Sequence, residues 1–358
     1  MVSAEDSSER LDAARDIAPP RRATVRDVAR EAGVALSSAS RVLMGHPDVS
    51  ARMHERVMTT ARDLGYEPDL IAQSLRTGRT HTLGFLVADL SNPIFADVIR
   101  GACDQARERG YSVLLTNSEG DSTFDAEHLQ LFLRRRVDGV ILLTVSSDSP
   151  DIDREIAVPS VPMVVFDRDV PAGSRVSTVY WDHASGFRDA VSTLIGHGHR
   201  EIAFIGGSDR LRPVRERLAG FAEALASAGM THDPALVRLG PLQAPFAREA
   251  TRDLLAGTPR PTALVVGANR LLPGVLEALH AAQVLPGRDL AIVSSDDVEL
   301  TRLYQPAISV VVRDTYGMGQ LAVRTVLERV DKPSAPIRSV TLPTRFVERA
   351  SSAWDIRE

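Results

Sequence analysis

Cysteine is almost absent from the sequence, which has one, Cys103, in 358 residues. A single thiol excludes an internal disulfide and a cysteine-based metal cluster. No uninterrupted apolar run approaches the roughly 20 residues that a membrane-spanning helix needs. The first 20 residues mix acids with arginines and lack an apolar segment, so no signal peptide is expected. These absences favour a globular, cytoplasmic protein with no membrane partner.

Positive charge is also scarce, since the formal net charge is −5, but it is unevenly distributed. Residues 21–80 carry ten arginines, no lysine and seven acids, a net charge of +3. All other residues together carry −8. A basic excess at one end suits contacts with nucleic-acid phosphates, although ordinary fluctuation in charge would produce the same pattern.

The length exceeds one ordinary hydrophobic core and predicts several domains. Residues 1–22 are polar and without periodicity, which is typical of a disordered arm. Residues 23–68 predict three short helices, and a short linker covers 69–80. A large second region is expected over 81–349, followed by a tail at 351–358.

From residue 82 onward, short apolar runs alternate with amphipathic segments. Expected strands lie at 83–88, 113–116, 140–143, 163–166, 202–205, 264–266, 291–293 and 308–312, and expected helices at 94–109, 124–136, 215–228 and 271–282. Buried strands that alternate with helices predict parallel, doubly wound α/β sheets. The region is too long for one such sheet, so we expect two lobes, one at about 81–180 and 313–340 and the other at about 181–312 and 341–350. A ligand would bind between them, beyond the carboxyl ends of the strands.

The segment 23–43, ATVRDVAREAGVALSSASRVL, has the layout of an all-α helix-turn-helix. Its first helix ends at Gly33, and small apolar residues recur where two helices would cross. The second helix offers an exposed face of residues suited to base edges and phosphates. These residues are Leu36, Ser37, Ser38, Ser40 and Arg41. An ordinary helical hairpin with a solvated serine-rich face has the same pattern.

The same segment resembles the DNA-binding head of the LacI/GalR family of transcriptional regulators. The matching residues are Thr24, Asp27, Val28, Ala29, Ala32, Gly33, Val34, Ser40, Arg41, Val42 and Leu43. The resemblance continues to about Arg349, and it implies a two-lobed core of the periplasmic-binding-protein type. It also implies a homodimer on palindromic operator DNA, with Thr24 and Ser50 added to the DNA-binding residues. The absence of a heptad-repeat tail favours a dimer over a tetramer.

By the same resemblance, residues 69–77 form a hinge helix that orders when two copies pair over the operator. Leu75 would wedge into a minor-groove step, Ala72 would let the two helices approach closely, and Arg76 would contact phosphate. Taken alone, without the flanking pattern, Leu75 is more typical of a plain linker leucine covered by the core.

The resemblance further assigns seven effector-binding residues to the cleft between the lobes. These are Ile94, Phe95, Asp167, Trp181, Arg217, Asn269 and Asp296. Carboxylates accept from hydroxyl groups, a guanidinium donates in fixed geometry, and an aromatic face packs on a sugar ring. A sugar, sugar phosphate or other polar metabolite is the expected effector, and the sequence leaves open whether it induces or corepresses.

Several positions depart from the family pattern: Ala35, Ser38, Ala39, Met44, Leu242, Ala268, Ser294 and Ser295. Ala35 replaces the serine expected to cap the recognition helix, at a cost of about 1 kcal/mol if nothing substitutes for it. The other changes predict an operator and a pocket that differ from those of a common hexose sensor.

Two other classes of protein share such a core. A transport protein would lack the DNA-binding head. The fold alone leaves an enzyme possible, but the sequence contains no Gly-rich phosphate loop, Gly-x-Ser-x-Gly elbow or metal-ligand cluster, and the head argues against one. His197 and His199 supply too few ligands for a metal and are typical of a helix-to-strand turn. We therefore expect a repressor of carbohydrate or small-metabolite genes that is not an enzyme and has no cofactor.

Overall fold

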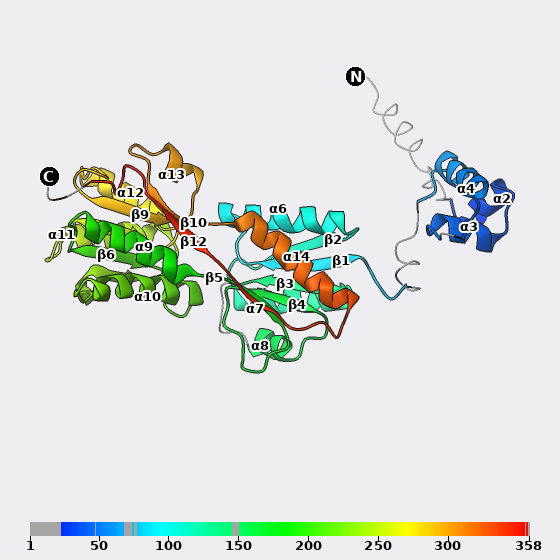
Figure 1. Cartoon of the computed structure of the whole chain (residues 1–358), viewed down its shortest axis with the longest axis horizontal. Coiled ribbons are helices and arrows are strands. Elements are labelled where there is room, and N and C mark those ends of the chain that lie inside the picture. The colour runs from blue at the N-terminus through cyan, green and yellow to red at the C-terminus, as the bar shows by residue number, and fades with distance from the viewer. Residues whose placement is uncertain are drawn as a thin grey trace, which may run out of the picture. The chain divides into compact units, whose positions relative to one another are not determined.

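The computed structural model describes residues 23–46, 48–67, 74, 77–144, 150–354 and 356. The chain divides into two units, Met1–Thr80 and His81–Glu358 (Figure 1). Three predicted hinge contacts, Ala72, Leu75 and Arg76, lie outside the described residues, as does the arm at 1–22. No helix in the described part of the chain is long and apolar enough to cross a membrane.

The first unit contains the three predicted helices, α2 (Val25–Glu31), α3 (Leu36–Leu43) and α4 (Ala51–Asp63). They enclose a core of small side chains, which lets short helices cross closely. Its buried members are Val28, Ala29, Ala32, Ala39, Val42, Val57 and Ala61. The turn between α2 and α3 passes through Gly33, whose φ of 60° a glycine adopts without strain.

The ends of these helices follow the predicted capping chemistry. Thr24 and Asp27 form a capping box, in which each residue's side chain accepts from the other's backbone N–H. Ser50 caps α4 by accepting from the backbone N–H of Met53 at 3.4 Å. Ala35 stands at the N-cap of α3 in an extended conformation with no side-chain hydrogen bond, so the predicted loss of a cap is confirmed.

The second unit is built on two six-stranded sheets, each sandwiched between helices (Figure 1). The sheet of lobe 1 is parallel throughout. Its order is β11 (Ser339–Leu342), β5 (Ser177–Trp181), β4 (Met163–Phe166), β3 (Gly139–Leu143), β1 (Thr82–Val87) and β2 (Ser112–Asn117). Helices α6 (Pro93–Glu108) and α14 (Thr315–Asp331) cover one face, and α7 (Ser122–Arg134) and α8 (Pro150–Ala157) cover the other.

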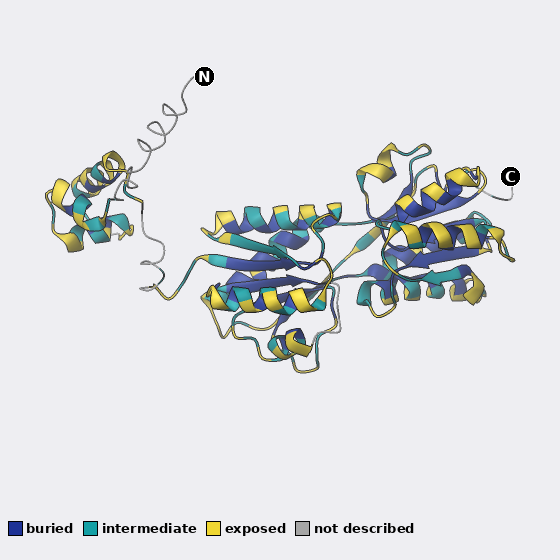
Figure 2. Ribbon diagram, turned by 180° about the vertical axis from the view of Figure 1, so that it is seen from behind, coloured by how far each residue is buried: buried dark blue, intermediate teal, exposed yellow. Residues whose placement is uncertain are grey.

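The sheet of lobe 2 is parallel except at one edge, where β12 runs antiparallel to β10. Its order is β12 (Thr344–Val347), β10 (Ser309–Arg313), β9 (Ala291–Ser295), β8 (Ala263–Val266), β6 (Ile202–Gly206) and β7 (Val237–Leu239). Helices α9 (His183–Gly196) and α10 (Arg212–Ser227) cover one face, and α11 (Ala244–Ala256) and α12 (Leu272–Ala281) cover the other; the short α13 (Glu299–Leu303) follows β9. In both lobes the central strands are the most buried elements (Figure 2).

The chain passes between the two sheets three times: from β5 to α9, from β10 to α14, and from β11 to β12. The second passage leads into α14, which lies directly against α6. At this contact a Cβ on Gly319 would lie 1.9 Å from the carbonyl oxygen of Val98, so only glycine allows the two backbones to meet. This close packing holds the last long helix on lobe 1, although the strand before it belongs to lobe 2.

The expectation of a separate tail from residue 351 is wrong. Ser351 and Ser352 are fully buried in lobe 2. The backbone N–H of Ile292 donates to the carbonyl of Ser351 at 2.9 Å, and the Ser351 hydroxyl donates to the carbonyl of Ile292 at 2.6 Å. Ile292 precedes the start of the β9–β10 pairing, so its buried backbone groups need partners from elsewhere. The chain end supplies them.

Candidate functional site

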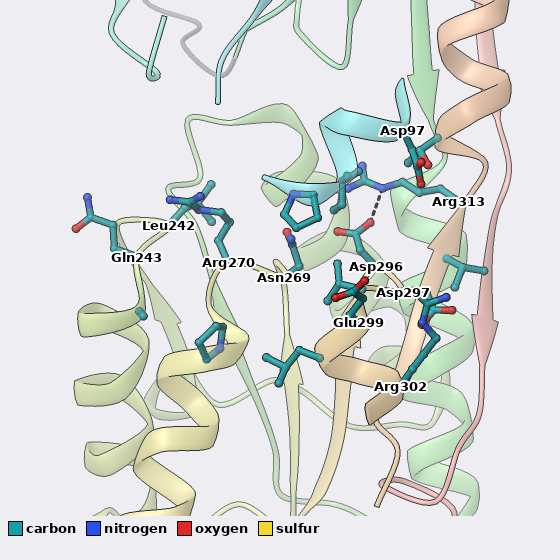
Figure 3. Close-up of a pocket in the computed structure, with 18 of the residues that line it drawn as sticks. Asp97, Leu242, Gln243, Asn269, Arg270, Asp296, Asp297, Glu299, Arg302 and Arg313 are labelled. Carbon is teal, nitrogen blue, oxygen red and sulfur yellow. Dashed lines mark hydrogen bonds and ion pairs between the residues drawn. The ribbon is translucent and has the colours of Figure 1, made fainter. Parts of the chain in front are cut away.

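The candidate site lies between the lobes, where strands of both sheets end. It consists of an inner cavity of about 100 Å³ and an outer cavity of about 1040 Å³. The two share a boundary of five residues: Leu242, Asn269, Arg270, Asp296 and Arg313 (Figure 3). Because the shared residues follow or end strands of lobe 2, the sheet edge forms one wall of both cavities.

The structure brings the seven sequence-predicted effector residues to this cleft. Six line the inner cavity: Phe95, Asp167, Trp181, Arg217, Asn269 and Asp296. Ile94 lines the outer cavity instead, together with Asn269 and Asp296. Two residues that the sequence comparison singled out as departures from the family pattern, Leu242 and Ala268, also line the inner cavity.

Asp167 follows β4 in a left-handed conformation, with a φ of 43°, and is held by both lobes. Its carboxylate accepts from the backbone N–H of Trp181 at 3.1 Å and from Nε2 of His183 at 2.9 Å. Arg212 of α10 adds a longer contact at 3.5 Å. Burial opposes ionisation of Asp167, but the contacts with His183 and Arg313 hold its pKa below the ordinary value. Lobe 1 therefore contributes a charged carboxylate to the inner cavity.

Asp296 follows β9 with a φ of 70° and forms an ion pair with Arg313 inside the cleft. Its Oδ1 accepts from Nε of Arg313 at 2.6 Å, and its Oδ2 accepts from the Ser295 hydroxyl at 2.8 Å. The Arg313 guanidinium lies 4.2 Å above the Trp181 ring. Burial opposes the ionisation of Asp296, but the adjacent guanidiniums of Arg313 and Arg217 outweigh it and lower the pKa of Asp296.

Arg217, on α10, is buried and has only neutral partners. Its Nη1 donates to the carbonyl of Gly267 at 2.5 Å, and its Nε donates to Nδ1 of His183 at 3.3 Å. Burial lowers the pKa of His183 to about 4, so this imidazole is neutral at pH 7. Burial and the charge of Arg313 lower the pKa of Arg217 to about 10, which still leaves the guanidinium charged.

The sequence did not single out four polar residues that line the inner cavity or contact Asp167: Asn92, His183, Arg212 and Arg313. Asn92 accepts from the side-chain amide of Asn269 at 2.9 Å, which joins lobe 1 to lobe 2. Arg313 ends β10, and the argument that selected Asp296 at the end of β9 applies equally to it. His183 and Arg212 carry no comparable signal, because each lies at the start of a helix.

The lobes are also joined at the rim. Arg270 of lobe 2 contacts Asp89 at 2.8 Å and the Ser91 hydroxyl at 2.7 Å, both on the loop after β1. Arg215 of α10 is ion-paired with Asp169, beyond the end of β4. The cleft is therefore closed by polar contacts on two sides, and a molecule bound inside would touch both lobes.

The predicted DNA-contact residues form part of the surface of the first unit. Leu36, Ser37 and Arg41 are exposed on α3, whereas Ser38 and Ser40 are half-buried. Thr24 and Ser50 lie exposed at the starts of α2 and α4. This leaves a polar helix face with an exposed guanidinium available to a partner.

A helix-turn-helix unit joined to a two-lobed core with a closed polar cleft defines a class: ligand-responsive DNA-binding regulators. Comparison with known proteins agrees. Residues 24–69 match the model described as bacterial regulatory proteins, lacI family, and residues 191–352 match that of the periplasmic binding protein-like domain.

The relatives cover nearly the whole chain. The ribose operon repressor of Escherichia coli K12 is 31% identical over 330 residues, which span 92% of this chain and 100% of the relative. The structure of the lac repressor dimer bound to operator and the anti-inducer ONPF has a TM-score of 0.82 and 25% identity, covering 93% of this chain and 99% of that one. A complex of the regulator CelR with cellobiose has a TM-score of 0.70 and 31% identity, covering 92% and 100%.

The chain belongs to the lacI family of bacterial regulatory proteins. It is a DNA-binding transcriptional regulator and not an enzyme. The predicted fold, an all-α head on a two-lobed core with parallel doubly wound sheets, is confirmed.

Proposed function

We propose that this protein is a cytoplasmic, homodimeric repressor of carbohydrate or small-metabolite genes. It binds a palindromic operator, and a small polar ligand in the cleft controls its affinity for that operator. The observation that carries the proposal is the closed polar cleft, in which the half-buried Asp167 of lobe 1 and the buried Arg217 and Asp296 of lobe 2 line one cavity. Relatives named for the ribose operon, and those solved with operator or cellobiose, support the same assignment.

The proposed control is a shift between two states of the core. A ligand held by Asp167 of lobe 1 and by Arg217 and Asp296 of lobe 2 stabilises the closed arrangement of the lobes. Closure would alter the geometry of two paired hinge segments, to which we assign Ala72, Leu75 and Arg76. The ligand is an inducer if closure separates the hinge segments and a corepressor if it pairs them.

Operator recognition is assigned to the exposed face of α3. Arg41 suits the edge of a guanine, the hydroxyls of Ser37, Ser38 and Ser40 suit bases or phosphates, and Leu36 suits a thymine methyl group. Thr24 and Ser50 add phosphate contacts where backbone N–H groups also point outward at helix starts. One such helix reads few bases, so selectivity requires the two half-sites of a dimer.

The test is selection of genomic fragments by the purified full-length protein. We expect recovery of a few sites that share a palindrome, and the adjacent genes would nominate ligands to be added in a second round. The Arg41→Ala variant should lose the enrichment, whereas Arg62→Ala, which removes another exposed arginine of the same unit, should keep it. Fragments without a shared motif, or equal enrichment by the wild type and Arg41→Ala, would contradict the proposal.

A further inference from the structure

Arg313 lies in the cleft as a bound ligand would. Its planar guanidinium is stacked on Trp181 with 4.2 Å between the guanidinium carbon and the ring centroid. Its Nε donates to Asp296 at 2.6 Å, and its Nη1 lies 3.9 Å from Asp167. A flat polar group held between an aromatic face and two carboxylates is the arrangement expected of a sugar ring. Here a side chain of the protein occupies it, and the inner cavity that remains measures about 100 Å³.

The acceptors of the inner cavity are consequently already in use. Asp167 accepts from Trp181 and His183, with Arg212 and Arg313 close by. Asp296 accepts from Ser295 and Arg313. A ligand rich in hydroxyl donors would have to displace these intramolecular donors, which lowers the gain from each new hydrogen bond.

The donors of the cavity are not fully used. Arg217 is 6% exposed, and no carboxylate of the described residues lies within ion-pair distance of it. Its partners, a backbone carbonyl and the neutral ring of His183, accept from Nη1 and Nε and leave Nη2 without an acceptor among the described residues. A buried guanidinium whose direct partners are neutral is costly, and an anion that entered the cavity would supply a charged group in direct contact with it.

The outer cavity favours one orientation for such an anion. Its wall carries Asp297 and Glu299 beside Asp296 (Figure 3). The same wall also carries Arg270 and Arg302, but Arg270 is ion-paired with Asp89 at 2.8 Å and Arg302 lies 4.0 Å from Asp297. Asp297 is further ion-paired with Arg349 at 2.9 Å, whereas Glu299 is exposed. Carboxylates at the rim repel an anionic group and accept from hydroxyls, so the anionic end of a ligand belongs on the inside and its hydroxyls face the rim.

We propose that the effector is a small polyhydroxylated anion whose carboxylate or phosphoryl oxygens are bound by Arg217 and Arg313. This inference rests on the proposed function and narrows its ligand class from polar metabolites in general to acids. Arg313 thereby determines specificity. It occupies the carboxylates that would accept hydrogen bonds from a neutral sugar, and it adds a charged donor that binds an acid.

The experiment measures binding to the full-length protein without DNA. Trp181 lines the inner cavity, and the sequence has one other tryptophan, Trp354. In the Trp354→Phe variant the tryptophan fluorescence therefore comes from Trp181 and reports on binding in the cavity. The probes are matched pairs at constant ionic strength: gluconate against glucose, galacturonate against galactose, ribonate against ribose, and ribose 5-phosphate against ribose. We expect at least one anion to bind with a Kd at least about tenfold below that of its neutral parent. The carboxylate and phosphate pairs distinguish the two sources of anionic oxygen.

Two variants test the assigned roles. Arg217→Gln should weaken binding of the preferred anion by about 10- to 100-fold, the loss of a charge-assisted contact. Arg313→Gln frees the carboxylates and should reverse the preference, so that the neutral parent binds more tightly than the acid. Arg313→Lys keeps the charge and should retain the acid preference if Arg313→Gln fails to fold. Arg248→Gln, on the exposed surface of α11, is the matched control and should bind as the wild type does.

Equal or tighter binding of every neutral parent, or binding by none of the anions, would overturn the proposal. If a folded Arg313→Gln variant kept the acid preference, Arg313 would not be the residue that determines specificity. Since no DNA is present, these outcomes do not depend on operator selection. If the protein binds acids but enriches no genomic site, the result would contradict the proposed repressor function and still support this inference.

Discussion

The two units of this protein place their recognition residues in opposite environments. In the helix-turn-helix unit, Leu36, Ser37 and Arg41 are exposed on a helix whose other side rests on a small core. In the two-lobed unit, Arg217 and Asp296 are buried and hydrogen-bonded to neighbouring residues. Residues of the exposed site can therefore be substituted without destabilising the helix that carries them, whereas residues of the cleft also stabilise the fold of the core. Substitutions should separate the two kinds of site by their effect on stability.

The largest effect is expected for Asp296→Ala. Removing this carboxylate leaves Arg313 without its close counter-ion and deprives Arg217 of a nearby negative charge. Loss of one partner of a buried ion pair destabilises a protein by about 3–5 kcal/mol. Chemical denaturation monitored by circular dichroism would measure it. Asp253→Ala, on the exposed side of α11, should change stability little, and equal stability of the two variants would contradict the structural role of Asp296.

A pH effect should follow from His183. Its pKa is about 4 in the folded protein against 6.5 for an ordinary histidine, so between these values the unfolded chain binds a proton that the folded chain does not. Stability should therefore fall as the pH is lowered from 6.5 towards 4, by about 2 kcal/mol at about pH 5. Below pH 3.8, protonation of Asp167 and Asp296, whose folded-state pKa values are lowered, should destabilise the protein further.

Unfolding free energies at several pH values would show this effect. The His183→Gln variant should lose less stability between pH 6.5 and 5 than the wild type does. His54→Gln, an exposed position on α4, should follow the wild-type curve. Parallel curves for the wild type and His183→Gln would mean that the buried imidazole is not the group responsible.

Arg41→Ala tests the exposed site. The truncation should weaken operator binding by about 10- to 100-fold, equivalent to about 1–3 kcal/mol for the loss of one base contact. The melting temperature should stay unchanged, because the Arg41 side chain is exposed on the surface of α3. Electrophoretic mobility shifts on the selected operator, beside thermal denaturation, give both values. A drop in melting temperature would show that the surface site is structural after all.

The smallest effect is expected at the start of α3. Ala35 already has the extended backbone of an N-cap, so Ala35→Ser should supply the missing hydrogen bond and stabilise the first unit by about 1 kcal/mol. Thr24→Ala should do the reverse at α2, where the capping box is present. Thermal denaturation followed by the circular dichroism signal of the α-helices would detect both shifts. No gain from Ala35→Ser would indicate that the backbone N–H groups at this helix start find other partners.

Much of the head could be predicted from the sequence, because its signals are local. Thr24, Asp27, Gly33 and Ser50 act on backbone groups within a few residues of themselves, and the structure shows the predicted caps and turn. Strands such as β3 and β8 were also predictable, since short apolar runs that are buried on both faces leave a plain pattern. The edge strands β7, β11 and β12 were missed because half-exposed strands mix polar and apolar residues.

The residues of the cleft likewise divide into those that the sequence places and those that it does not. Asp167 and Asp296 stand directly after apolar strands, so their place at a sheet edge follows from the order of residues. The chain by itself thus determined a DNA-reading head, two parallel sheets and the residues that line the gap between them. Only the tertiary structure decided that Arg313 lies over Trp181 and against Asp296, and that Ser351 completes β9. Those contacts join residues far apart in the chain, and no local pattern encodes which of these side chains will meet in the folded protein.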